Sequence, residues 1–217
     1  RSTLFPYTTL FRSRTGCTKE ALQVSKSPKE NTGNQSQTAI ANSVSPASLK
    51  IISGPLILDS TRLPIIKHYI GERFGGGIIF YLTSNNHGLI ADLTDLPPAT
   101  WAANRKLIKT GARGTGIGDG KLNTNQIVAA QGSLFNHAAL ECDISSKGGQ
   151  TDWYLPSKDE LNQLYRQKAV VGNFSVYSYW SSSEVDSATA SHQGFTIGLQ
   201  NPGGKNAPLN VRAIRSF

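Results

Sequence analysis

The chain has 217 residues, with 22 Lys and Arg against 14 Asp and Glu, a formal net charge of +8, 38% hydrophobic residues and 21 Gly. This length accommodates one domain of ordinary size with extensions. No apolar run approaches the roughly 18 residues of a membrane-spanning helix, and the glycines have no period of three, which excludes a helical membrane bundle and a collagen. Two cysteines are too few for a disulfide-stapled miniprotein or a four-cysteine zinc site. Because the chain contains no Met, we expect a processed product or a fragment.

Much of the excess positive charge lies near the N-terminus. Residues 1–14 carry three Arg and no acid, and residues 15–50 have a net charge of +2. Residues 51–217 carry 15 basic and 12 acidic residues, a net charge of +3, with the two signs dispersed. A nucleic-acid-binding domain is expected to gather its basic side chains on one face. We therefore expect no nucleic-acid partner.

The first residues, RSTLFPYTTLFRS, resemble a translated sequencing adapter. They contain neither a strand alternation that continues into the chain nor a helical stripe, and such additions are excluded from fold reasoning. We interpret residues 1–14 as this artefact, with a genuine basic N-terminal segment as the alternative.

Residues 15–64 predict a lipid anchor and a tether. Thr15-Gly16-Cys17 resembles the end of a bacterial lipobox, whose Cys carries the lipid, although Arg14 stands where that pattern has an apolar residue. The polar residues that follow are typical of a disordered tether. We expect a lipoprotein of the bacterial cell envelope or surface, held to the membrane only through Cys17. If Cys17 is an unmodified thiol, we expect a secreted protein.

From residue 65 onwards the sequence predicts short strands, tight turns and helices. The expected elements are strands at residues 67–72, 76–82 and 88–93 and helices at residues 123–132 and 136–142. An Asn- and Gly-containing turn at residues 84–88 joins the second and third strands as a hairpin.

A capped helix follows. Ser157 is placed to accept hydrogen bonds from the first-turn N–H groups, and Glu160 to reach back to the backbone of Ser157, which is a capping box. Leu161, Leu164 and Tyr165 then lie on one face of the predicted helix.

Three more strands are predicted at residues 178–184, 193–199 and 208–217. The order of strands, helices and strands predicts an α+β domain at residues 65–217, with antiparallel strands, two to three short helices and long loops.

Six sequence motifs of this domain together resemble those of a known protein family. They are, in chain order, IGERFGGGIIFYL, HGLIA, GIGDGKLNTNQIVAAQG, DWYLPSKDELNQLY, YWSSSE and VRAIRSF. In this order and spacing they resemble the Lcl C-terminal domain family, named after a collagen-like bacterial adhesin, over about residues 68–217. The resemblance implies a C-type-lectin-like fold of the formylglycine-generating-enzyme branch. It also implies a cell-surface ligand-binding or adhesion module.

Several residues of these motifs are expected to have structural roles: Trp153, Leu155, Pro156, Ser157, Glu160, Trp180, Glu184 and Arg212. Residues 153–156 are interpreted as core packing at a strand-to-helix corner, with a sugar platform as the alternative. Arg212 and Arg215 are expected to pair with Glu184 or Asp186.

A binding surface is predicted on loops at residues 185–210. Its candidate ligand-binding side chains are Asp186, His192, Gln193, Asn201, Lys205, Asn206 and Asn210, which we expect to be exposed. Such side chains can hydrogen-bond sugar hydroxyls, and ordinary solvated turns are the alternative. The expected partner is a glycan or a surface protein.

No enzyme is predicted, and no catalytic residue is assigned. The Gly-rich segment 114–120 matches neither the dinucleotide fingerprint nor the P-loop, and the G-x-S-x-G, S-x-x-K and H-E-x-x-H motifs are absent from the sequence. Formylglycine-generating oxidases use a reactive cysteine pair, whereas Cys142 is the domain's single Cys and is interpreted as a buried apolar residue. An enzyme of related fold and an architectural envelope domain are the alternatives.

No cofactor or metal is predicted. Asp119, Lys121, Asn123 and Asn125 partly resemble a calcium loop, but Ala130 stands where an EF-hand requires Glu. An irregular calcium site near Asp119 is the alternative.

Overall fold

The computed structural model describes residues 67–217, which fall within one compact unit of the chain. The predictions for residues 1–14 and 15–64, including the lipidation of Cys17, lie outside the described residues. The elements in chain order are β1 Arg73–Phe74, β2 Gly77–Leu82, β3 Gly88–Asp92, β4 Leu96–Ala99, η1 Ala103–Arg105, α1 Gly120–Gln131, α2 Ala138–Asp143, η2 Lys147–Gly149, α3 Lys158–Arg166, α4 Lys168–Val171, β5 Ser178–Glu184, β6 Thr189–Gly194, β7 Gln200–Gly204, β8 Leu209–Val211 and β9 Ile214–Ser216.

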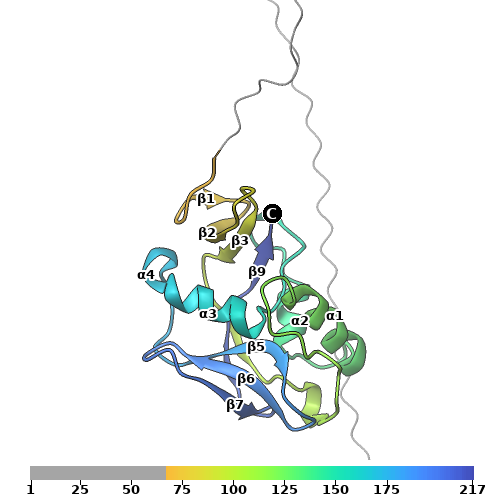
Figure 1. The fold of residues 1–217 in the computed structure, drawn as a ribbon. Coiled ribbons are helices and arrows are strands. Elements are labelled where there is room, and N and C mark those ends of the chain that lie inside the picture. The colour runs from red at the N-terminus through yellow and green to blue at the C-terminus, as the bar shows by residue number, and fades with distance from the viewer. Residues whose placement is uncertain (1–66) are drawn as a thin grey trace, which may run out of the picture. The chain divides into compact units, whose positions relative to one another are not determined.

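The strands form two sheets, and helix α3 lies between them (Figure 1). One sheet has the order β1-β2-β3-β9 and is antiparallel throughout. The other has the order β4-β8-β5-β6-β7, in which only the β5–β8 pair is parallel. Helix α3 contacts β2 of the first sheet and β5 and β6 of the second. It therefore covers one face of β5 and β6.

The chain crosses from one sheet to the other near its C-terminus. Strand β8 ends at Val211 in the five-stranded sheet, and β9 begins at Ile214 in the four-stranded sheet. The two residues between them, Arg212 and Ala213, are buried. Tyr154 pairs with Ile214 and receives a hydrogen bond from its backbone N–H at 3.0 Å. The crossover therefore lies in the interior of the domain.

Two apolar clusters fill the interior. The first contains Trp101, Trp153 and Trp180, and the second contains Leu164 and Tyr179. Successive residues of a strand point to opposite faces, which explains why the neighbours Tyr179 and Trp180 of β5 belong to different clusters. Both faces of β5 thus pack against apolar side chains.

Helix α3 begins with the predicted capping box. The Ser157 hydroxyl accepts from the backbone N–H of Glu160, and the Glu160 carboxylate accepts from the backbone N–H of Ser157 at 2.7 Å. Glu160 also accepts from the Gly118 backbone N–H at 2.9 Å and from the Tyr154 hydroxyl at 3.3 Å. Burial raises the pKa of Glu160. A side chain at Gly120 would collide with this carboxylate, so glycine is required where α1 approaches α3.

Several predictions of local structure are confirmed. The domain is α+β, and the hairpin of β2 and β3 and the strand at residues 178–184 lie where expected. The helices predicted at residues 123–132 and 136–142 correspond to α1 and α2. The C-type-lectin-like topology implied by the family resemblance stays a prediction.

Other boundaries were wrong. Residues 67–72 form no strand and contain a turn at Ile70 and Gly71, just before the short strand β1. The strand predicted at residues 193–199 ends at Gly194, because Gly198 adopts a φ of +79° within a turn. The strand predicted at residues 208–217 is broken at Arg212 into β8 and β9. Strand β4 was missed because it contains two prolines, which are tolerated at the edge of a sheet.

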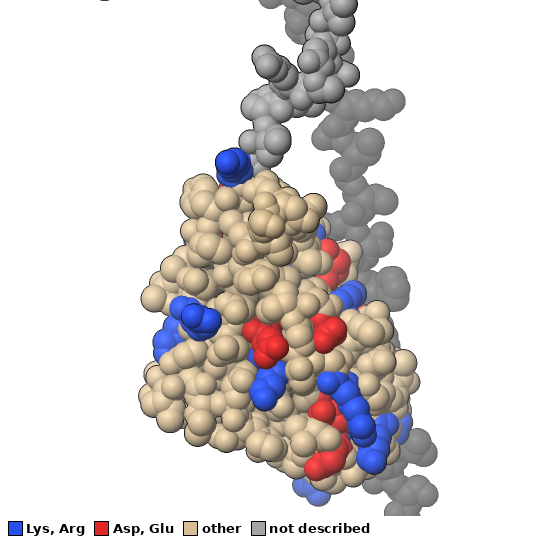
Figure 2. Space-filling model, in the orientation of Figure 1, with Lys and Arg blue, Asp and Glu red and all other residues tan. Residues whose placement is uncertain are grey.

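The surface of the described domain mixes the two signs of charge. On the face drawn in Figure 2, the Lys and Arg side chains alternate with Asp and Glu side chains and do not form one basic patch. This distribution matches the near balance of charge over residues 51–217.

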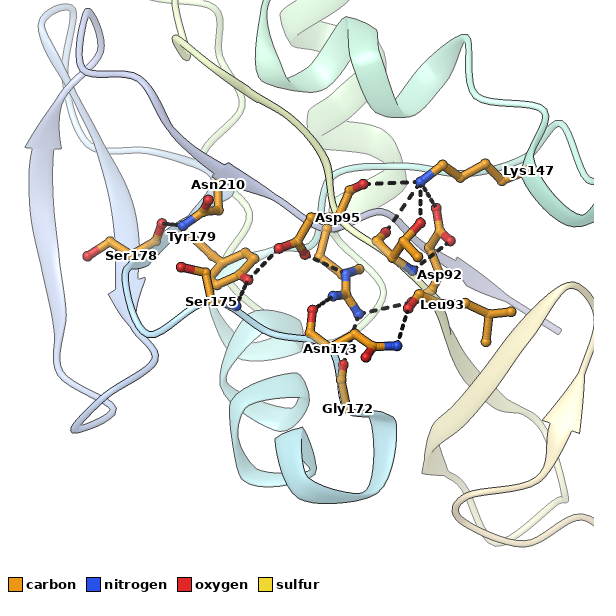
Figure 3. Close-up of polar contacts among 12 residues, drawn as sticks. Asp92, Leu93, Asp95, Lys147, Gly172, Asn173, Ser175, Ser178, Tyr179 and Asn210 are labelled. Atoms are coloured by element: carbon orange, nitrogen blue, oxygen red, sulfur yellow. Dashed lines mark hydrogen bonds and ion pairs between the residues drawn. The ribbon is translucent and has the colours of Figure 1, made fainter.

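The buried Arg212 guanidinium connects the crossover to two loops. Figure 3 labels its partners Asp92, Asp95 and Asn173. Its Nε donates to Asp95 Oδ1 at 2.7 Å, and its Nη1 and Nη2 donate to the carbonyl oxygens of Asp92 and Asn173 at 3.1 and 2.6 Å. The guanidinium carbon lies 4.0 Å from the centre of the Phe174 ring. Charge-assisted bonds of this kind are stronger than neutral ones. They hold the segment after α4 against the segment between β3 and β4.

The predicted pairing of the two arginines with Glu184 or Asp186 was wrong. Arg212 pairs with Asp95, and Arg215 pairs with Asp152 at 2.6 Å. Glu184 instead pairs with Lys205, because both side chains are enclosed together in the interior.

Replacement of Arg212 tests the importance of the crossover network. Arg212→Met leaves the Asp95 carboxylate and the Asn173 carbonyl without their charged donor, and we expect it to lower the free energy of unfolding by ~3–5 kcal/mol. The matched control is Arg215→Met, whose partner Asp152 is 49% exposed and whose loss is expected to cost about 1 kcal/mol or less. Urea denaturation of the three proteins measures both values. Equal costs for the two substitutions would contradict the prediction.

Candidate functional site

An open groove lies at the end of the five-stranded sheet, on the face opposite α3. It has a volume of about 600 Å³. Its lining residues are Val176, Tyr177, Ser178, His192, Gly194, Thr196, Ile197, Leu199, Asn201, Pro208 and Leu209. We call this feature the Tyr177 groove. It draws residues from β5, β6, β7 and β8 and from the turns beside them.

Large apolar side chains are exposed along the walls of the Tyr177 groove. The exposed fractions are 64% for Val176, 73% for Tyr177, 75% for Ile197 and 56% for Leu199. Exposed large apolar residues that gather at one place mark interaction sites in soluble proteins. The walls therefore distinguish this groove from an ordinary polar depression.

Hydrogen bonds fix the two walls to each other. The Phe195 backbone N–H donates to the Tyr177 carbonyl at 3.1 Å, and the Thr196 hydroxyl donates to the Val176 carbonyl. Phe195 itself is buried and packs on Phe174 and Tyr179. The turn that carries Ile197 and Leu199 is thus fastened to the segment that carries Tyr177, and the groove is formed in the free protein.

The polar part of the groove comes from adjacent strands. His192 of β6 lies opposite Trp180 of β5 and Asn201 of β7, and Ser178 lies opposite Gly194. Directly opposed residues on neighbouring strands point to the same face of a sheet. This register places the Ser178, His192 and Asn201 side chains in one row beside the apolar walls.

His192 is held as a neutral side chain. Its ring meets the Trp180 ring edge-on with centroids 5.9 Å apart, and, among the described residues, its buried Nδ1 has no hydrogen-bond partner. Burial lowers the pKa of His192. None of the described residues that line the groove is Asp, Glu, Lys or Arg, so the groove carries no charge at neutral pH.

Two of the seven predicted ligand-binding residues, His192 and Asn201, line the Tyr177 groove. Asp186 and Asn206 are exposed on turns outside it. Asn210 is half-buried and donates to the Ser178 carbonyl at 3.2 Å. Ligand binding by these seven residues stays a prediction.

The expected exposure of Gln193 and Lys205 was wrong, because both side chains are buried. Gln193 donates to Asn162 Oδ1 on α3 and to the Gly198 carbonyl, both at 3.0 Å. It points to the α3 side of the sheet, away from the groove.

Lys205 is enclosed with Glu184 and supports the β7–β8 turn. Its Nζ lies 2.6 Å from Glu184 Oε1, 3.0 Å from the Ile108 carbonyl and 4.3 Å from the centre of the Trp101 ring. Burial alone would raise the pKa of Glu184, but the hydrogen bonds from Lys205 and from two backbone N–H groups lower it. Because Pro208 follows in the same turn, Lys205 positions the groove indirectly.

The groove residues that sequence reasoning missed are Val176, Tyr177, Ile197 and Leu199. Ile197 and Leu199 were assigned to a strand because of their β propensity, and a strand would have buried one of its faces. The available signal was the glycine at each end of GFTIG, which is typical of a turn.

The other candidate residues of the sequence analysis lie outside the Tyr177 groove. The Cys142 thiol is buried, and burial raises its pKa well above the ordinary value. Asp119 accepts a hydrogen bond from the Gly116 backbone N–H at 2.8 Å, and Asn123 donates to the Gly114 carbonyl at 2.6 Å. In residues 67–217, no three His, Cys, Asp or Glu side chains lie close enough together to hold a metal ion. The same residues contain no helix long and apolar enough to span a membrane.

Comparison with known proteins gives only weak structural similarity. No family model matches the chain, and no curated protein matches it. A fimbrial protein from Bacteroides ovatus is similar over 62% of this chain, with a TM-score of 0.43 and 17% sequence identity. The match spans 37% of the fimbrial protein's chain. This similarity is too low to transfer a role, and the functional argument rests on the groove itself.

Acidification is expected to destabilise the domain through His192. The folded state lowers the pKa of this ring, so the unfolded chain binds the proton more readily and the free energy of unfolding falls as the pH drops through about 6.5. In His192→Asn, the loss of stability between pH 7 and pH 5 is expected to be smaller than in the natural sequence. The pKa of His137 is also lowered by burial. His137 therefore still contributes a loss of stability on acidification in the variant. Urea midpoints at the two pH values measure the effect, and an unchanged pH dependence in the variant would refute it.

Proposed function

We propose that this domain is a non-enzymatic binding module of the bacterial cell surface and that its Tyr177 groove binds an uncharged glycan. The observation that carries the proposal is a Tyr residue that is 73% exposed in a preformed groove without charged side chains. A tyrosine combines an apolar ring with a hydroxyl, which suits a ligand that has both apolar and polar surfaces. A sugar has such surfaces, because its ring presents C–H groups on one side and hydroxyls at its edge.

The polar row beside the ring supports this ligand class. Ser178, His192, Thr196 and Asn201 bring hydroxyl, imidazole and amide groups to a mostly apolar groove. Binding sites commonly combine an apolar lining with a few polar groups that fix orientation. The lack of charged lining residues favours a neutral sugar over an acidic one, because an acidic sugar would be left without a cationic partner.

The enzyme alternative receives less support. A cysteine-dependent oxidase needs an accessible thiol that ionises readily, whereas the pKa of the buried Cys142 thiol is raised. Two buried carboxylates, Glu160 and Glu184, accept several hydrogen bonds each and hold loops in place. We therefore assign no catalytic residue.

A protein partner is the second candidate. The exposed side chains of Val176, Ile197 and Leu199 would also suit an apolar segment of another protein. An architectural role would use the same surface in contact with a neighbouring envelope protein. Binding of either protein would depend on the aliphatic side chains of the groove more than binding of a glycan does. Substitution of an aliphatic side chain therefore distinguishes a protein ligand from a glycan.

Glycan binding depends on Tyr177 in this proposal. With the full chain on an array of neutral and acidic glycans, we expect binding to one or more neutral glycans. Tyr177→Ala is expected to weaken that binding about tenfold or more, because aromatic side chains at the centre of a site carry much of the affinity. The matched control is Tyr69→Ala, which removes a Tyr that is 65% exposed and lies outside the groove.

Three outcomes would contradict the glycan assignment. One is the absence of binding to every neutral glycan. Another is an equal loss of binding in Tyr177→Ala and Tyr69→Ala. The third is binding to a defined partner protein that Ile197→Ser abolishes, with no effect of any glycan as a competitor.

A lipid on Cys17 is part of the proposed surface location. We expect mass spectrometry of the native protein to find a diacylglycerol-type lipid on the peptide that contains Cys17, which anchors the domain through its acyl chains. The Cys142 peptide serves as the internal control and is expected to be unmodified. An unmodified Cys17 thiol in protein taken from native cells would overturn the anchor.

A further inference from the structure

A second hollow adjoins the Tyr177 groove and shares Tyr177 with it. This second hollow has a volume of about 400 Å³ and is lined by Pro98, Ser175, Tyr177, Ser178, Pro208, Leu209 and Asn210. Tyr177, Ser178, Pro208 and Leu209 line both hollows. The two hollows are therefore neighbours that share a boundary of four residues.

We propose that the two hollows are successive subsites for a linear neutral oligosaccharide, with Tyr177 at their junction. This inference rests on the proposed glycan function and names its ligand as a chain of several sugars instead of a single residue or a chain end. One sugar lies against the Tyr177 ring, and the chain extends into the 600 Å³ hollow on one side and the 400 Å³ hollow on the other.

The sizes of the hollows support a ligand of more than one unit. Sites for small ligands have volumes of about 300–1,000 Å³, so each hollow is large enough for a ligand group of its own. The shared floor is continuous because Ser178 begins β5 and Leu209 begins β8, and these parallel strands pair directly where Tyr179 lies opposite Asn210.

Hydrogen bonds also fix the walls of the second hollow. The Ser175 backbone N–H donates to the Tyr179 hydroxyl at 2.6 Å, and that hydroxyl donates to Asp95 Oδ2 at 2.7 Å. On the other wall, the Asn210 amide donates to the Ser178 carbonyl at 3.2 Å. Figure 3 shows the bonds of Ser175, Tyr179 and Asp95 and, next to them, the bond between Asn210 and Ser178. Binding across both hollows would therefore need little ordering of the protein, which lowers the entropic cost.

The lining of the second hollow also fits a neutral chain. Its described residues include no Asp, Glu, Lys or Arg, as in the first hollow. A repeating neutral polymer can place the same uncharged groups in both subsites. A ligand with one charged end would find no side chain of opposite charge in either subsite.

The test uses two chain-length series of neutral glucose oligosaccharides, one β-1,4-linked and one α-1,4-linked, from the monosaccharide to the hexasaccharide. Calorimetric titration of the full chain is expected to give an affinity that rises about tenfold or more from disaccharide to hexasaccharide in the series that binds. Pro98→Ser changes the second hollow alone and is expected to reduce this length dependence. Pro97→Ser is the matched control, because Pro97 is the adjacent exposed proline of β4 and lies outside both hollows.

The outcomes separate this inference from the proposed function. Equal affinity for all chain lengths, or a hexasaccharide affinity that Pro98→Ser leaves unchanged, would overturn the second subsite while glycan binding stands. Equal effects of Pro97→Ser and Pro98→Ser would also overturn it. Failure of both series and of every neutral glycan on the array to bind would overturn the proposed function together with the inference.

Discussion

The guanidinium of Arg212 is the constraint on which the arrangement of this domain depends. It is buried at the point where the chain leaves the five-stranded sheet and enters the four-stranded sheet. A buried charge is costly unless it is paired and hydrogen-bonded. Arg212 meets this requirement only if Asp95 and the carbonyl oxygens of Asp92 and Asn173 converge on it. The charge therefore specifies how three segments distant in the sequence meet.

This network also fixes the geometry of the proposed binding surface, the Tyr177 groove. Asn173 and Phe174, which contact the guanidinium, directly precede the segment that carries Val176 and Tyr177. Asp95 accepts from the hydroxyl of Tyr179, the residue that packs against Phe195 below the opposite wall. The Lys205–Glu184 pair acts similarly at the β7–β8 turn. Exposed apolar walls are thus supported by buried charges that touch no part of the groove, which explains how an exposed surface is kept in one conformation.

Sequence patterns predicted the elements that are determined by interactions between residues close together in the chain. The capping box of Ser157 and Glu160, the β2–β3 hairpin and strand β5 are defined by residues close together in the chain, so their patterns suffice. Pairings between distant residues were not predictable in this way. The burial of Lys205 depends on a partner 21 positions away, and the environment of Arg212 depends on an aspartate 117 positions away.

The candidate site illustrates the same limit. Polar composition indicated residues 185–210, which contribute His192 and Asn201 to the groove. Of the apolar residues that define its walls, Ile197 and Leu199 were assigned to a strand, and Val176 and Tyr177 were assigned to no element. Ile197 has strong β propensity, yet Gly194 and Gly198 flank its turn, and the hydrogen bond from Gly198 N–H to the Gly194 carbonyl closes that turn at 2.8 Å. Exposure of an apolar residue is a tertiary property, because it depends on the absence of a packing neighbour and not on the residue itself.

The central claim, that the Tyr177 groove is the binding surface of this domain, is tested most directly by nuclear magnetic resonance. The measurement is a titration of the isotopically labelled full chain with the neutral oligosaccharide that binds most tightly, observed through the backbone amides. The account predicts that the largest chemical-shift changes occur at Tyr177, Ser178, Asn201 and Leu209, around the groove and its junction with the second hollow. Changes concentrated elsewhere, for example around the separate hollow lined by Tyr81, His87 and Lys121, would contradict it.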